Sequence, residues 1–96
     1  MGNTTHTKPP RPERISKRIP VSLIVKANGK EARRAGSTLD ISRGGLRIQT
    51  IRPLYEGQAI YLLPAKGAPH SGYYRVVWVR QTNESAPPEA GLKLLN

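Results

Sequence analysis

The chain alternates apolar and polar residues over short stretches, a pattern typical of half-buried β-strands. From residue 21 to residue 27 every odd position is apolar, and further period-2 runs recur as far as residue 95. These runs predict six strands, at residues 21–27, 30–42, 46–51, 58–63, 73–81 and 89–95. No stretch keeps the 3.6-residue period of an amphipathic helix, and no internal repeat is visible.

Turn residues separate these runs and set the direction of the strands. Asn28-Gly29 follows the first run, and this dipeptide is the strongest short-range hairpin signal, so the second strand should return antiparallel. Gly36 suggests a bulge or bend in that strand, while Pro64 ends the fourth strand and opens a loop over residues 64–72. The expected fold is all-β, a small six-stranded antiparallel barrel whose closure removes exposed edges.

The alternation also predicts which side chains face the core. Ile60 and Leu62 are the expected inward pair of the fourth strand. The fifth strand is apolar on both faces, so the pattern alone does not orient it. We expect Trp78 to fill the core; a base-stacking platform of Tyr73, Tyr74 and Trp78 is the less favoured alternative.

Length and composition limit the classes of protein. A chain of 96 residues has room for one domain, and the absence of cysteine excludes disulfides and thiolate metal sites. Residues 1–13 are polar and interrupted by three prolines, so we expect a disordered basic tail before a domain at residues 14–96. No apolar run reaches the roughly 18 residues of a membrane span, which predicts a soluble, cytoplasmic protein without membrane insertion.

The charge balance indicates an anionic partner. The formal net charge is +10, and basic residues outnumber acidic ones both in residues 1–19 and in the rest of the chain. Nucleic acid, a nucleotide and an acidic protein surface are the candidates. A charge excess that only aids solubility is the alternative.

The chemistry concentrates in residues 40–45, Asp-Ile-Ser-Arg-Gly-Gly. On a strand, Asp40 and Ser42 share one face, so a carboxylate and a hydroxyl stand side by side. Gly44 and Gly45 allow a turn with positive φ and the close approach of a flat or anionic group. Capping of a strand end by Asp40 and Ser42 is the alternative.

Arg14 and Arg18 form the second candidate element. A spacing of four residues puts both guanidinium groups on one side of a strand or a helix, so they can converge on one ligand. Pro20 favours an extended backbone just before it, which predicts an ordered linker entering the first strand. A solvated basic tail is the alternative.

Catalysis and metal binding are not expected. His6 and His70 have no partner at metal-ligand spacing, and Ser42 has neither a nucleophile elbow nor a plausible histidine base. We therefore expect a protein that is not an enzyme and needs no cofactor.

Taken in order, these motifs resemble the PilZ domain, a bacterial receptor module for cyclic di-GMP. The resemblance covers roughly residues 13–95 and rests on Arg14, Arg18, Pro20-Val21, Asp40, Ser42, Gly45, the RVVW of residues 75–78 and the AGLKLL of residues 90–95. It implies a six-stranded barrel that binds the dinucleotide on its outer surface, without the long C-terminal helix of many members. It also implies that binding orders the arginine linker and so signals to a downstream protein partner.

The resemblance assigns roles to the candidate residues. Arg14 and Arg18 would grip guanine edges and phosphates, while Asp40, Ser42 and Gly45 would hold the other base. The expected ligand-binding set is Arg14, Arg18, Asp40, Ser42, Arg43, Gly44 and Gly45. Arg33, Arg34 and Arg47 are interpreted as a solvated face. Glu13 stands where the family often has a basic residue, and its carboxylate opposes nearby phosphates.

The chemistry of guanine fits these roles independently. Its O6 and N7 acceptors suit an arginine fork, and its N–H donors suit a carboxylate. Two other functions stay open from the sequence: a small basic barrel that binds RNA or single-stranded DNA, which we favour less, and a degenerate domain used only for protein interaction.

Overall fold

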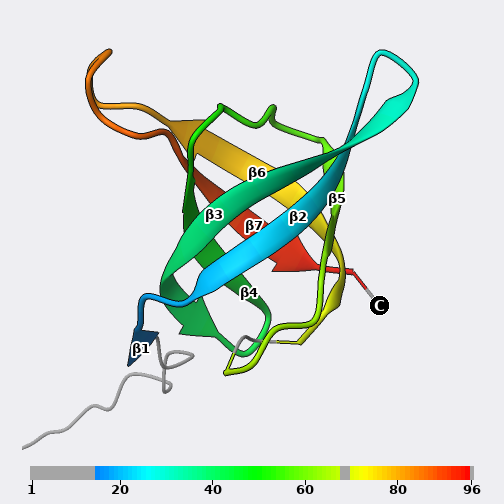
Figure 1. The fold of residues 1–96 in the computed structure, drawn as a ribbon. Coiled ribbons are helices and arrows are strands. Elements are labelled where there is room, and N and C mark those ends of the chain that lie inside the picture. Colours follow the sequence, from blue (N-terminus) through cyan, green and yellow to red (C-terminus); the bar gives the residue numbers. More distant parts are fainter. Residues whose placement is uncertain (1–14, 68–69, 96) are drawn as a thin grey trace, which may run out of the picture.

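The computed structural model describes residues 15–67 and 70–95, which form a closed antiparallel barrel (Figure 1). Its strands are β1 (Ile15–Ser16), β2 (Pro20–Ala27), β3 (Lys30–Ser42), β4 (Gly45–Thr50), β5 (Ala59–Leu62), β6 (Gly72–Arg80) and β7 (Glu89–Leu94). The described residues contain no helix, and thus none that could cross a membrane. The expected tail, Glu13 and Arg14 lie outside the described residues.

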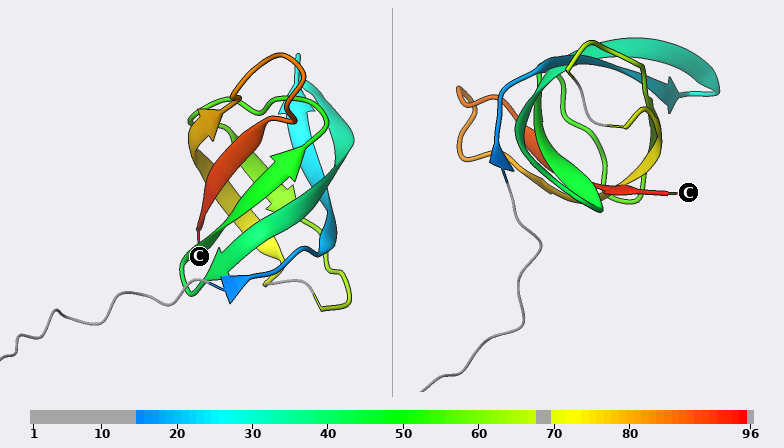
Figure 2. Two further views of the ribbon diagram at one scale, coloured as in Figure 1. Left: turned by 90° about the vertical axis from the view of Figure 1, so that its left-hand side faces the viewer. Right: turned by 90° about the horizontal axis from the view of Figure 1, so that it is seen from below.

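Six strands close the barrel, and β1 adds to it from outside. The order is β3-β2-β5-β6-β7-β4, and β4 pairs back with β3 to complete the ring seen along the barrel in Figure 2. Every pairing is antiparallel. The predicted all-β barrel is therefore confirmed, with β1 as an additional strand paired to β3.

The barrel interior holds the apolar face of each strand. Leu23, Ile48, Leu62 and Val76 are fully buried, and Ile60 is 1% exposed, which confirms the predicted inward pair of β5. The other members of the core cluster are Ile19, Val21, Val25, Leu46, Leu54, Tyr74, Ala90 and Leu92. Removal of this apolar surface from water is the main force that stabilises the barrel.

Tyr74 orients β6, which the sequence pattern left open. Its ring is buried, and its hydroxyl donates a 2.7 Å hydrogen bond to the carbonyl oxygen of His70. Burial raises the pKa of the Tyr74 hydroxyl above its ordinary value of 10.0. Because ionisation is harder in the folded state, this group favours folding below about pH 10 and ceases to do so as the pH rises through the folded pKa.

Two predicted local features have different outcomes. The β2–β3 hairpin is confirmed, since Asn28 and Gly29 adopt φ values of 54° and 76° and Ala27 pairs with Lys30. The bulge predicted at Gly36 is wrong, because Gly36 pairs regularly on both sides and the register shift lies between Thr38 and Asp40. Gly36 instead allows close approach: a Cβ there would lie 2.9 Å from the carbonyl oxygen of Gln49.

Candidate functional site

The segment between the two candidate arginines lies against the strand that carries Asp40. In the β1–β3 pairing, Ile15 is opposite Ile41 and Ser16 is opposite Asp40. The amide of Lys17 continues this contact by donating a 3.2 Å hydrogen bond to the carbonyl oxygen of Leu39. Ser16 is midway between Arg14 and Arg18, so the two predicted sequence elements meet at one place on the barrel.

The buried side chain of Thr38 holds the linker against β3. Its side chain is fully buried, and its hydroxyl accepts a 2.8 Å hydrogen bond from the amide of Ile19 while donating to the carbonyl oxygen of Lys17. The register shift follows directly, so that Thr38 pairs with Ile48 and Asp40 with Arg47. A bulge re-aims the strand locally. The sequence alone did not identify Thr38, because threonine is common inside strands.

Replacing Thr38 by valine should loosen the linker. The variant keeps the shape of the side chain but leaves the amide of Ile19 and the carbonyl of Lys17 without their partner, which costs about 2 kcal/mol. We expect lower stability in urea and faster amide hydrogen exchange at Ile19. Thr50→Val is the matched control, because Thr50 is also buried but bonds the carbonyl of Arg52. Unchanged exchange at Ile19 in Thr38→Val would contradict this role.

Asp40 is held by an arginine that the sequence analysis placed on the solvated face. The Nε atom of Arg47 lies 2.9 Å from Asp40 Oδ2, and its Nη1 lies 3.5 Å from Glu89 Oε1. Arg80 Nη2 contacts the same Glu89 oxygen at 2.9 Å. The Asp40 side chain is only 13% exposed and that of Arg47 33%, so the pair is shielded more than a surface ion pair.

A groove opens beside this ion pair. Its volume is about 420 Å³, and it is lined by Asp40, Leu46, Arg47, Val77, Trp78, Gly91 and Leu92. Trp78 comes from β6 and lies against β7, where a Cβ on Gly91 would be 2.1 Å from the indole Nε1. The guanidinium carbon of Arg80 is 5.5 Å from the centre of the Trp78 ring, within the range of a cation–π contact.

The prediction that Trp78 fills the core is wrong. Tyr74 and Val76 point inward, but the register of the β6–β7 pairing shifts between Val76 and Trp78. The shift breaks the alternation, so Trp78 lies half-buried on the outside of the barrel. An indole, a carboxylate and a guanidinium thus face one groove.

Arg18 extends the same outer face. Its Nη1 donates a 3.2 Å hydrogen bond to Oε1 of Gln49, which shares a face of β4 with Arg47. Arg18 is exposed and available to a ligand. Arg14, the other arginine of the predicted pair, lies outside the described residues.

The remaining predicted residues surround the β3–β4 turn. Ser42, Arg43 and Gly45 line a second groove of about 520 Å³, and the Ser42 hydroxyl donates a 3.2 Å hydrogen bond to the carbonyl oxygen of Gly45. Gly44 is exposed in the turn itself. The structure therefore brings Asp40 together with Arg47, places Arg18 at Gln49 on the same outer face, and places these four residues at the adjoining β3–β4 turn.

The positive φ expected at the two glycines is wrong, whereas the close approach of a ligand to them stays a prediction. Neither Gly44 nor Gly45 has a positive φ. A Cβ on Gly45 would lie 2.2 Å from the carbonyl oxygen of Leu92, whereas a Cβ on Gly44 would meet nothing within 4 Å. Gly45 is therefore required by the close approach of β7.

The pairing of Asp40 with Arg47 had a signal in the sequence. Ser42 and Gly45 pair across the turn, so positions that are equally far from the turn, such as Asp40 and Arg47, face each other. A turn at Arg43-Gly44 is sufficient to predict this pair. Trp78 had no such signal, because its position depends on a bulge. Among the described residues, no group of three or more His, Cys, Asp or Glu could hold a metal.

Comparison with known proteins supports the interpretation of these motifs. The family model of the PilZ domain matches residues 12–96, which is most of the chain, whereas no curated protein matches it. PilZ domains are binding modules rather than enzymes, and the family is known for binding cyclic di-GMP. The match, the closed barrel and the pairing of Ser16 with Asp40 agree, and the chain belongs to the PilZ domain family.

Proposed function

We propose that this protein is a receptor for cyclic di-GMP that binds its ligand on the outer face formed by β3, β4 and the arginine linker, and acts without catalysis or cofactor. One observation carries the proposal: Ser16, the midpoint of the two arginines, lies opposite Asp40. This arrangement presents cations and a carboxylate to the same ligand.

Each group in the site has a counterpart on the ligand. The Asp40 carboxylate accepts hydrogen bonds from the N–H donors of a guanine, while Arg18 donates to its O6 and N7 atoms. The two phosphates of the ring require cations, which Arg14 and Arg18 supply from the linker. Arg47 adds a third cation next to Asp40.

Arg47 also prepares the site for the ligand. In the free protein it lies between Asp40 and Glu89 and offsets the charge of both carboxylates. Its Nε–H has no aligned hydrogen-bond acceptor among the described residues, so the Asp40–Arg47 contact is an ion pair without a well-directed hydrogen bond. A guanine that donates to Asp40 leaves Arg47 able to turn towards a phosphate.

The linker is the element that we expect to carry the signal. β1 has two exposed residues, and among the described strands it pairs with the end of β3 alone. Ligand contacts to Arg14 and Arg18 would hold it more firmly, since binding one ordered conformation shifts the population towards it. A downstream protein that binds this ordered conformation of the linker would then respond to cyclic di-GMP.

Asp40→Asn tests the base contact. Cyclic di-GMP should bind the wild type, whereas cyclic di-AMP, which has the same phosphates but lacks the guanine donors, should bind far more weakly. The variant loses hydrogen bonds to a charged acceptor, worth about 1.5–3 kcal/mol, so its affinity for cyclic di-GMP should fall about 10- to 100-fold. Titration calorimetry measures the affinity of the wild type for both ligands and the affinity of the variant for cyclic di-GMP. Glu56→Gln is a control of the same chemistry away from the grooves at the site. Equal binding of both ligands by the wild type would contradict the proposal.

A further inference from the structure

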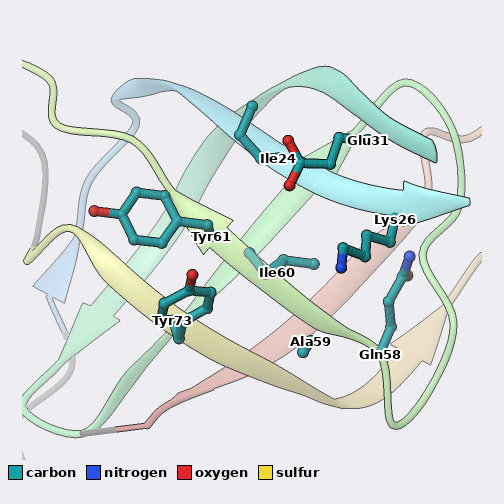
Figure 3. Close-up of a pocket in the computed structure, with 8 residues that line it drawn as sticks. All are labelled: Ile24, Lys26, Glu31, Gln58, Ala59, Ile60, Tyr61 and Tyr73. Carbon is teal, nitrogen blue, oxygen red and sulfur yellow. The ribbon is translucent and has the colours of Figure 1, made fainter. Parts of the chain in front are cut away.

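A third groove lies on the opposite side of the barrel from β4. It has a volume of about 640 Å³ and runs over β2, β5 and the start of β6 (Figure 3). In the barrel order β3-β2-β5-β6-β7-β4, the strand β5 is three positions from β4 in either direction. The groove is therefore separate from the site proposed for cyclic di-GMP.

One row of side chains across this face is aromatic and apolar. The strand registers place Ile24 opposite Tyr61, and Tyr61 opposite Tyr73. The two tyrosine rings meet edge to face, with centroids 4.9 Å apart and an interplanar angle of 71°. Tyr73 is 61% exposed, so its ring is accessible to a ligand. Core filling was the favoured prediction for these aromatic residues, and Tyr74 fills the core whereas Tyr73 does not.

The neighbouring row on the same face is cationic. Two residues further along each strand, Lys26 and Ala59 line the groove, Ala59 is opposite Arg75, and Arg75 is opposite Lys93. A two-residue step is about 6.6 Å along a strand. Lys26 and Arg75 are exposed, whereas Lys93 pairs with Gly45 and so lies towards the other site. Among the described residues that line the groove, the acid is Glu31, which pairs with Lys26.

We propose that this face binds single-stranded nucleic acid, with bases stacked on Tyr61 and Tyr73 and phosphates along Lys26 and Arg75. An aromatic row beside a cationic row is the arrangement that such a strand needs, since bases stack on aromatic rings while a basic groove follows the backbone. The inference goes beyond the proposed function, because it concerns another face and another ligand.

The geometry favours a single strand over other anionic partners. A duplex keeps its bases stacked on each other, so it reaches the cations but cannot use the tyrosines. An acidic peptide satisfies the cations but gains little from an open ring face. A single strand uses both rows at once, and every base has a face that can stack.

Fluorescence anisotropy with labelled 12-nucleotide oligothymidine and oligouridine tests the proposal. We expect saturable binding by the wild type, and a loss of about 5-fold or more in Tyr73→Ala, because stacking is worth about 1–3 kcal/mol per base. Tyr55→Ala is the matched control: Tyr55 is 71% exposed but does not line the groove, and its loss should change affinity less than 2-fold.

Salt dependence tests the cationic row. Each of Lys26→Ala and Arg75→Ala should weaken binding several-fold and reduce the slope of log affinity against log salt by about 0.7, the value for one phosphate contact on a single strand. Arg52→Ala, which removes an exposed arginine outside the groove, should not reduce the slope. Arg18→Ala and Asp40→Asn should leave oligonucleotide binding unchanged.

Three results would overturn the proposal. One is that folded wild-type protein binds neither oligonucleotide, even at a protein concentration about 100-fold above a micromolar dissociation constant. Another is equal affinity for a 12-base-pair duplex or an acidic peptide of matched charge. The third is an equal effect of Tyr73→Ala and Tyr55→Ala.

Discussion

Arg18→Ala should lower the affinity for cyclic di-GMP by about 30-fold or more. The exposed guanidinium of Arg18 donates to Gln49 and faces the same side of the barrel as Arg47. A ligand that covers Arg18 would bury its contacts, and truncation of one partner of a buried hydrogen-bonded charge pair costs about 2–5 kcal/mol, which is at least a 30-fold loss in affinity. Titration calorimetry at about 0.15 M salt, where distant charges are largely screened, measures this loss.

Lys17→Ala is the control for charge alone. Lys17 is next to Arg18 and carries the same charge, but the contacts that fix it here are made by its backbone amide and carbonyl. Its loss should weaken binding less than about 3-fold, as expected for one screened surface charge. Similar losses in the two variants would mean that the linker acts only through its total charge.

Gly45→Ala should lower the free energy of unfolding by about 3 kcal/mol. The added Cβ would lie 2.2 Å from the carbonyl oxygen of Leu92, so β4 and β7 must move apart where Gly45 pairs with Lys93. Such overpacking against backbone lies at the upper end of the usual 1–3 kcal/mol. Urea unfolding followed by the fluorescence of Trp78, the one tryptophan of the chain, measures the change.

The adjacent glycine provides a matched control. A Cβ added to Gly44 would meet no atom within 4 Å, and the φ of Gly44 is not positive, so alanine fits without strain. Gly44→Ala should leave stability unchanged or raise it by about 0.4–1 kcal/mol, because the unfolded chain loses freedom. If both variants unfold at the same urea concentration, the close approach of β7 does not explain Gly45.

The alternation of side chains was enough to predict the barrel. Burial of one face is the strongest constraint on a strand, so Leu23 and Ile60 could be placed inside from the pattern alone. The Asn28-Gly29 turn was equally readable, because few dipeptides adopt two positive φ values in succession. These features depend on neighbours in the sequence.

Features that depend on distant contacts could not be read in this way. The register shifts after Thr38 and after Val76 arise from how strands fit around a closed barrel, and they decide where Asp40 and Trp78 point. The need for glycine at position 45 comes from the backbone of β7, which is far away in the chain. The alternation of apolar and polar residues predicts neither the register shifts nor the close approach of β7.

The candidate site likewise contains residues that the sequence identified and residues that only the fold revealed. The motif residues Arg18 and Asp40 were identified by sequence and lie on one face of the barrel, although their contact with a ligand stays a prediction. Arg47 was not predicted although the turn at Arg43-Gly44 implies its pairing with Asp40, and Thr38 was not predicted because a threonine in a strand is common. Their importance follows from the partners that the fold gives them.

Titration calorimetry of the wild-type protein with cyclic di-GMP tests the central claim most directly. At about 0.15 M salt we predict saturable heat with a dissociation constant in the micromolar range or below, which corresponds to about −8 kcal/mol or stronger. Cyclic di-AMP, with the same phosphates, should give little heat. The absence of heat with tens of micromolar cyclic di-GMP, from protein that unfolds cooperatively in urea, would contradict the account.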